Sequence, residues 1–115
     1  MDKLLDIEAQ KNIILPSIYK NFYTRCATSI PEKLIGTDLV NNSDELNEWA
    51  KEVLSENKIK SFLNDDDFVF MMHQGYMFWY FKANGDPDPI VYAYRENNVF
   101  PEKRERFSEF IKQFC

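Results

Sequence analysis

The sequence predicts an α+β fold in which helices pack on one face of an antiparallel β-sheet. The first observation is a series of short apolar, aromatic runs between residues 68 and 95, separated by glycine-bearing turns. Runs of this kind are typical of an antiparallel meander. The second observation is that apolar residues with helical spacing occur both before and after this stretch. Helices, then a sheet, then a helix indicate a single layer of each kind around one core.

Two helices are expected in the first thirty residues. Residues 3–14, where apolar positions alternate with charges, form the first helix. Pro16 fits the first turn of a helix but not its interior, so it begins the second. Ile18, Phe22 and Cys26 follow at i, i+4 and i+8 and give this helix an apolar face.

A short strand and a third helix should follow. Residues 33–40 have the character of a strand or extended segment, and both Asn42 and Ser43 are suitable helix N-caps. Glu45, three residues after Asn42, completes a possible capping box. The helix has an apolar stripe at i, i+3, i+4, i+7 and i+8: Leu46, Trp49, Ala50, Val53 and Leu54. A polar loop over residues 57–67 then leads to the meander.

The three strands of the meander are separated by two turns. His73-Gln74-Gly75 forms the first turn and Asn84-Gly85-Asp86 precedes the third strand, Ile90 to Tyr94. Alternation sends successive side chains to opposite faces. One face receives Tyr76, Phe78 and Tyr80, and the other receives Met77, Trp79 and Phe81. Because helices are expected on one face alone, the other face should lie partly open or be covered by a loop or a partner.

The chain should close with a helix over residues 104–114. Its apolar stripe is Phe107, Phe110, Ile111 and Phe114. Together with the short N-terminal strand, these elements predict one domain over residues 1–115.

Composition limits the classes of function. The hydrophobic content of 44% and the aromatic content of 16% fit a folded domain that needs neither disulfides nor a metal. The net charge of −5 argues against binding a nucleic-acid backbone and permits a basic partner. Cys26 and Cys115 make no disulfide framework. With no signal peptide and no membrane-spanning apolar run in the sequence, we expect a cytoplasmic protein.

No catalytic, cofactor or metal site is predicted. The single histidine, His73, has no recognisable nucleophile partner, and no phosphate-binding glycine loop occurs. The acidic cluster Asp65-Asp66-Asp67 lacks a calcium-loop pattern, so we expect a solvated loop whose last residue begins a strand. Asp86 and Asp88 alternate with prolines, which favours turn hydrogen bonding.

The ordered set of features resembles the SUKH superfamily, the Smi/Knr-type domain of yeast cell-wall assembly regulators and of many bacterial proteins. The resemblance covers roughly residues 5–114, and each of its motifs is short and hydrophobic. The family often has an Asn-Gly pair after the second helix, which Thr24–Ala27 lacks. The residues that carry the resemblance are Leu15-Pro16 with Tyr19 and Phe22-Tyr23, Ile30-Pro31, Leu34, Gly36–Leu39, Leu46–Leu54, Asp67–Phe70, Gly75-Tyr76, Phe78–Phe81, Pro89–Tyr92 and Phe107–Phe110.

This resemblance implies a non-enzymatic protein-binding domain. Many bacterial members are thought to be immunity proteins that neutralise a toxin, often a nuclease or deaminase, and an acidic inhibitor suits a basic toxin. We expect the partner-binding surface to combine acidic loops with an aromatic residue: Asp65, Asp66, Asp86, Asp88 and Trp79. The alternatives are a regulatory or scaffolding module without a toxin partner, and a small enzyme using His73 or the acidic cluster.

Overall fold

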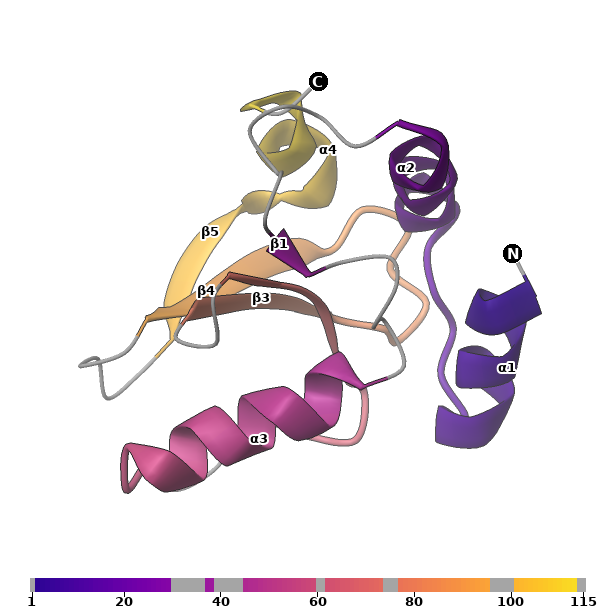
Figure 1. Cartoon of the computed structure of the whole chain (residues 1–115). Coiled ribbons are helices and arrows are strands. Elements are labelled where there is room, and N and C mark those ends of the chain that lie inside the picture. The colour runs from indigo at the N-terminus through magenta and orange to yellow at the C-terminus, as the bar shows by residue number, and fades with distance from the viewer. Residues whose placement is uncertain are drawn as a thin grey trace.

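A computed structural model of the chain describes residues 2–29, 37–38, 45–59, 62–73, 77–95 and 101–113 (Figure 1). The helices are α1 (Asp2–Lys11), α2 (Ser17–Thr28), α3 (Leu46–Glu56) and α4 (Phe107–Phe110), which continues as the 3-10 turn η2 (Ile111–Gln113). The strands are β1 (Thr37–Asp38), β2 (Asp67–His73), β3 (Met77–Lys82), β4 (Ile90–Arg95) and β5 (Glu102–Arg106). The α+β class predicted from the sequence is confirmed.

The strands form one antiparallel sheet in the order β1-β2-β3-β4-β5. Strands β2, β3 and β4 are the predicted meander. β1 lies within the segment 33–40 that was expected to be extended, and the rest of that segment lies outside the described residues. β5 was not predicted, because its five charged residues lack the alternation of apolar side chains that marks a strand. Pairing with β4 defines it, and its charges suit the edge of a sheet.

One extra residue interrupts the pairing of β2 with β3. Val69 pairs with Tyr80 and Met71 pairs with Trp79, so Phe70 has no partner residue of its own. This is a β-bulge. Phe70 and Met71 both belong to the core cluster beneath α2, although they are adjacent in sequence. The bulge therefore places two consecutive large side chains in the same core.

Helices cover both faces of the sheet, so the prediction of a single covered face is wrong. Figure 1 shows α2 and α4 on one side of the sheet and α3 on the other. The reason is that both faces of the meander are apolar and aromatic, and each must be removed from water. The stripe of α3 supplies the second cover: Leu46, Ala50, Val53 and Leu54 are buried, and Trp49 is partly buried.

The two core clusters differ in how their aromatic rings pack. On the α2 face, Tyr19 lies at the centre of a group of tilted and edge-on rings contributed by Phe68, Phe70, Phe81 and Phe107, with centroids 5.3–6.2 Å away. On the α3 face, Phe62 packs against Phe78, Tyr80 and Tyr94, with centroids 5.8–6.4 Å away. The loop before β2, expected to be polar, thus contributes an aromatic side chain to a core.

The first helix ends earlier than predicted. It stops at Lys11 because Asn12 takes a left-handed conformation with φ 54°, which Asn tolerates better than most residues. The Ile13 N–H then donates to the Glu8 carbonyl at 3.2 Å, closing the helix as a Schellman-type end. Residue 14, predicted to be helical, instead forms a bridge with Asn84. The second helix begins directly after Pro16, as predicted.

The last helix begins later than predicted. Residues up to Arg106 pair with β4, and the helix starts at Phe107, whose N–H donates to the Pro89 carbonyl at 2.8 Å. The predicted stripe is correct where the structure describes it, since Phe107, Phe110 and Ile111 are buried. Residue 114 and the proposed N-caps of α3, Asn42 and Ser43, lie outside the described residues.

Candidate functional site

A cleft of about 400 Å³ lies where the end of α1, the first half of α3 and the loop before β2 meet. It brings together two of the predicted partner-binding residues, Asp65 and Asp66. The lining residues are Lys11, Asn12 and Ile13 from the end of α1, Asn47 and Lys51 from α3, and Leu63, Asn64, Asp65 and Asp66 from the loop.

The α1 side of the cleft is held in place by contacts of the Glu8 carboxylate. Its Oε2 accepts a hydrogen bond from the Leu15 N–H at 2.8 Å, and its Oε1 lies 3.1 Å from the Lys20 Nζ. The Ile14 N–H also donates to the Ala83 carbonyl at 3.3 Å. These contacts tie the chain after α1 to α2 and to the end of β3, so this wall of the cleft has a fixed position.

The opposite wall is organised by Asp67. Its Oδ2 accepts from the Asn64 N–H at 2.8 Å, and its own N–H donates to the Asn64 carbonyl at 3.1 Å. The Ala83 N–H donates to the Asp66 carbonyl at 2.7 Å. The main chain of this loop is therefore held from both sides. Asp67 begins β2, as predicted, and is buried, whereas the Asp65 side chain is exposed.

Asn47 connects α3 to the buried start of β2. It is 6% exposed, its Nδ2 donates to the Asp67 carbonyl and its Oδ1 accepts from the Val69 N–H, both at 2.8 Å. The two described residues of β1 pair with Met72 and His73 at the end of β2, and the Asn47 amide makes the corresponding hydrogen bonds at the start of β2. The sequence analysis missed this role. The available signal was a polar residue within the apolar arc of a helix.

An ion pair joins β2 to β3 next to the cleft. The Lys82 Nζ lies 3.0 Å from the Asp67 Oδ1, with the Asp67 side chain almost fully buried. Burial acts to lower the pKa of Lys82, but the hydrogen bond and the charge of Asp67 outweigh it, so the pKa is raised. Because a buried carboxylate needs such partners, Asp67 serves the structure.

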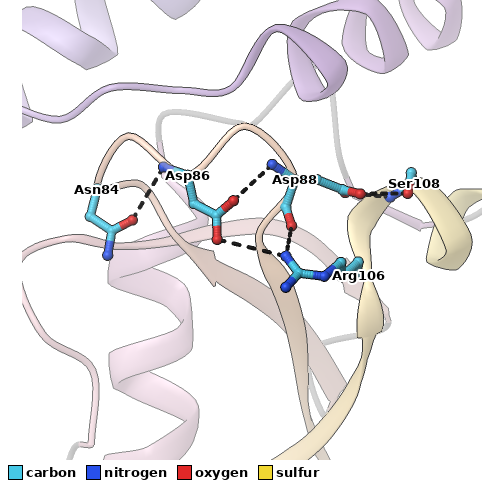
Figure 2. Close-up of polar contacts among 5 residues, drawn as sticks. All are labelled: Asn84, Asp86, Asp88, Arg106 and Ser108. Carbon is cyan, nitrogen blue, oxygen red and sulfur yellow. Dashed lines mark hydrogen bonds and ion pairs between the residues drawn. The ribbon is translucent and has the colours of Figure 1, made fainter.

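Asp86 and Asp88 form a hydrogen-bonded turn between β3 and β4 (Figure 2). The Asp88 N–H donates to the Asp86 Oδ1 at 3.0 Å, which is the predicted turn bonding. Both Asp88 carboxylate oxygens accept from Ser108, at 2.9 Å from its N–H and 2.7 Å from its hydroxyl. The Arg106 Nη1 donates to the Asp88 carbonyl at 2.8 Å and lies 3.9 Å from the Asp86 Oδ2. This turn fixes the start of α4.

Trp79 lies on β3 away from the cleft. Its ring is partly buried against the α2-face core, 6.4 Å from the ring of Phe110. The structure therefore distributes the five predicted residues over three places: the cleft, the β3–β4 turn and the α2 face of the sheet. Their role in binding a partner stays a prediction.

The outer face of α3 carries an acidic stripe. We define this stripe as Glu45, Glu48, Glu52 and Glu56, which are all exposed. Their spacing of three or four residues places them on one side of the helix. Lys51 contacts Glu48 at 3.6 Å and lies between the stripe and the cleft. The glutamates were visible in the sequence as the polar side of an amphipathic helix, but nothing distinguished them from an ordinary solvated face.

The described residues hold no group of three or more His, Cys, Asp or Glu side chains that could bind a metal ion. Cys26 is buried in the α2-face core, and His73 lies at the end of β2 opposite Met77. Within the described parts of the chain, no helix has the length and apolar character to cross a membrane.

Comparison with known proteins gives one assignment. A family model described as the SMI1/KNR4 family (SUKH-1) matches residues 2–113. Searches of curated proteins and of solved structures found no significant match. The match includes every described element, from α1 to η2. The chain therefore belongs to the SMI1/KNR4 family (SUKH-1), as the sequence resemblance indicated.

Proposed function

We propose that this chain is a non-enzymatic immunity protein, which binds a bacterial toxin in the cytoplasm and neutralises it. The support is its family, whose members are generally non-catalytic immunity or regulatory domains. A basic toxin domain, such as a nuclease or a deaminase, is the partner that best fits the charge of −5.

The observation that carries the proposal is the uneven distribution of charge. The acidic stripe of α3 and the carboxylates of Asp65 and Asp66 lie on α3 and the following loop. In contrast, β5 carries both signs of charge, and its Arg104 contacts Glu102 and Glu105 at 4.0 and 3.7 Å. A surface with an excess of one sign of charge attracts a partner of the opposite sign and speeds their association more than a balanced surface does.

Co-expression with the toxin domain encoded beside this gene tests the proposal. We expect the wild-type chain to protect cells and to co-purify with the toxin. The double variant Glu48→Lys/Glu52→Lys should slow association about tenfold or more at low salt, with a smaller effect at high salt. Glu109→Lys, on the exposed surface of α4, is a control for charge reversal outside the stripe and should behave as wild type. Absence of both protection and binding would reject the proposal.

The second candidate is a regulatory or scaffolding module without a toxin partner. It is favoured by the family description, which includes the SMI1/KNR4 type. The neighbouring genes separate the two candidates: an adjacent toxin gene supports immunity. A gene without such a neighbour, whose product binds other proteins through α3, supports the module.

A further inference from the structure

We propose that the cleft between α1 and the loop at residues 63–66 binds a protein segment that carries one basic and one acidic side chain. The segment would belong to the binding partner, so the inference rests on the proposed function and adds to it the chemistry of one contact. It concerns the cleft, and it does not depend on the acidic stripe of α3.

The size and rigidity of the cleft suit a binding site. Its volume of about 400 Å³ lies within the range of small-ligand sites. The wall from α1 is fixed by Glu8 and by the left-handed turn at Asn12. The facing wall is fixed by Asp67 and by the Ala83 N–H. A ligand would therefore meet walls that are already ordered, which lowers the entropy cost of binding.

The two walls carry charges of opposite sign that do not pair with each other. Lys11 lines the α1 wall, and Asp65 and Asp66 line the loop wall. Within the described residues, the side chains of these three residues form no hydrogen bond or ion pair. The other lysine of the cleft, Lys51, already contacts Glu48 at 3.6 Å. Among the described residues, Lys11 and Asp65 therefore have no charged partner, and Asp66 acts only through its charge on Lys82.

Other polar side chains of the molecule already have partners. Asp67 binds Lys82 and the Asn64 N–H. In the Asn47 side chain, which lines the cleft, both the amide nitrogen and the amide oxygen are hydrogen-bonded to β2. Asp88 binds Ser108 through both oxygens. The cleft differs from these sites, because its Lys11 and Asp65 side chains make no hydrogen bond or ion pair with another described residue.

The charge pattern selects the ligand. A segment with only a basic group would pair with the aspartates but would meet the unmatched charge of Lys11, and a segment with only an acidic group would face two carboxylates. A segment with one basic and one acidic group pairs with the charges of both walls. Ile13 and Leu63, which also line the cleft, offer apolar surface for the aliphatic stems of such side chains.

An NMR titration with a blocked tripeptide tests the inference. The probe is Arg-Gly-Glu with acetylated and amidated ends, and the comparisons are Arg-Gly-Gln, Gln-Gly-Glu and Gln-Gly-Gln with the same ends. We expect Arg-Gly-Glu to shift the amide signals of Asn12, Ile13, Asn64 and Asp65, with a Kd on the order of 1–10 mM. Each peptide with a single charge should bind at least about threefold more weakly, and the neutral peptide should cause no saturable shift.

Three variants make the test specific. Lys11→Glu and Asp65→Lys should each weaken Arg-Gly-Glu binding by about fivefold or more. Lys112→Glu makes the same charge change as Lys11→Glu, but in η2, outside the cleft, and should have no effect. A native-like amide spectrum for each variant shows that it folds. Shifts that are scattered over the surface, or equal for the neutral peptide, would overturn the inference.

The toxin-binding experiment keeps the two proposals separate. If the toxin binds Lys11→Glu and Asp65→Lys as tightly as wild type, the cleft is not part of the interface and this inference fails while the immunity function stands. If the tripeptide binds in the cleft but the toxin binds no form of the protein, the immunity function fails. A loss of toxin affinity in both cleft variants, but not in Lys112→Glu, supports both.

Discussion

The two faces of the sheet are covered in different ways. The α2 face is closed by α1, α2 and α4, whose buried side chains form one cluster with β2, β3 and β4. The α3 face is closed by one helix and by the segment that contains Phe62. Rings on the α2 face meet mostly edge-on or tilted around Tyr19, whereas on the α3 face several lie nearly parallel, as Tyr80 does on Tyr92 at 18°.

This difference suggests separate roles for the two faces, one in stability and the other in binding a partner. Several helices converge on the α2 face, so most of its area is committed to the core. The α3 face is thinner, and its outer layer carries the acidic stripe and one wall of the cleft. A domain of this size has a single sheet to build on. The arrangement lets one face hold the fold together while the layer over the other face presents charge to a partner.

The largest effect is expected at alkaline pH, where the protein should unfold and the packing on both faces of the sheet should be lost together. Burial, with a smaller contribution from Tyr23 and Cys26, raises the pKa of Tyr19 on the α2 face. On the α3 face, burial followed by the charge of Asp67 raises the pKa of Tyr80. A tyrosine in the unfolded chain ionises near pH 10, so the unfolded state loses protons first. Stability is therefore complete below about pH 10 and falls as the pH rises above it.

The raised pKa of Lys82 acts in the same direction. Its charged form is stabilised by Asp67, so that contribution is present below about pH 10.4, the value of an unfolded lysine, and is lost above it. Circular dichroism and tyrosinate absorbance should be followed through the same titration. We expect part of the tyrosinate signal to appear only with unfolding. A full tyrosinate signal in a protein with native circular dichroism would contradict this.

Truncating one ring on each face should show the difference in packing directly. Phe70 is 1% exposed and lies 5.3 Å from the rings of both Phe81 and Phe107, so Phe70→Ala should cost about 3–5 kcal/mol. Phe62 is only partly buried, so Phe62→Ala should cost about 1–2 kcal/mol. Urea unfolding measures both values. Equal losses would contradict the expected difference between these two side chains.

The two hydrogen bonds of Asn47, which join α3 to the sheet, should give the next largest effect. Asn47→Ala removes two buried hydrogen bonds, one to the Asp67 carbonyl and one from the Val69 N–H. We expect a loss of about 2–3 kcal/mol in the free energy of unfolding. Asn57→Ala removes one partly buried bond to the Tyr94 hydroxyl and should cost less than about 1 kcal/mol. If Asn47→Ala costs no more than Asn57→Ala, water replaces the amide at the edge of β2.

The parts of the fold that the sequence predicted are those with a strong local pattern. The meander and the stripe of α3 follow from periodicity, and the start of α2 follows from Pro16. The second helical face was missed because alternation shows that both faces are apolar but does not show what covers each. β5 and the early end of α1 were missed because pairing with β4 and the bridge from Ile14 to Asn84 are tertiary events.

The cleft could be predicted only in part. Asp65 and Asp66 stood out as an acidic cluster in a loop, and Asp86 and Asp88 were correctly given turn bonding as their structural role. Lys11 could not be placed beside them, because more than fifty residues of chain separate it from the loop. The use of Asn47 was hidden for the same reason, since its partners lie 20 and 22 residues away.

The smallest effects should come from two tyrosine hydroxyls, one on each face. The Tyr19 hydroxyl is buried and has no hydrogen-bond partner among the described residues, whereas the Tyr94 hydroxyl accepts from the Asn57 Nδ2 at 3.2 Å. Burying an unpaired hydroxyl is unfavourable, so Tyr19→Phe should leave stability unchanged or raise it by up to about 1 kcal/mol.

Tyr94→Phe should instead lower stability by about 0.5–1 kcal/mol, because it removes a made hydrogen bond. Thermal unfolding of the two variants beside wild type measures the difference, and both substitutions keep the ring and its packing. A loss in Tyr19→Phe as large as that in Tyr94→Phe would show that the Tyr19 hydroxyl is bonded in solution. The α2 face would then hold a buried polar link of its own, and the contrast with the α3 face, where Asn47 and Tyr94 make such links, would no longer hold.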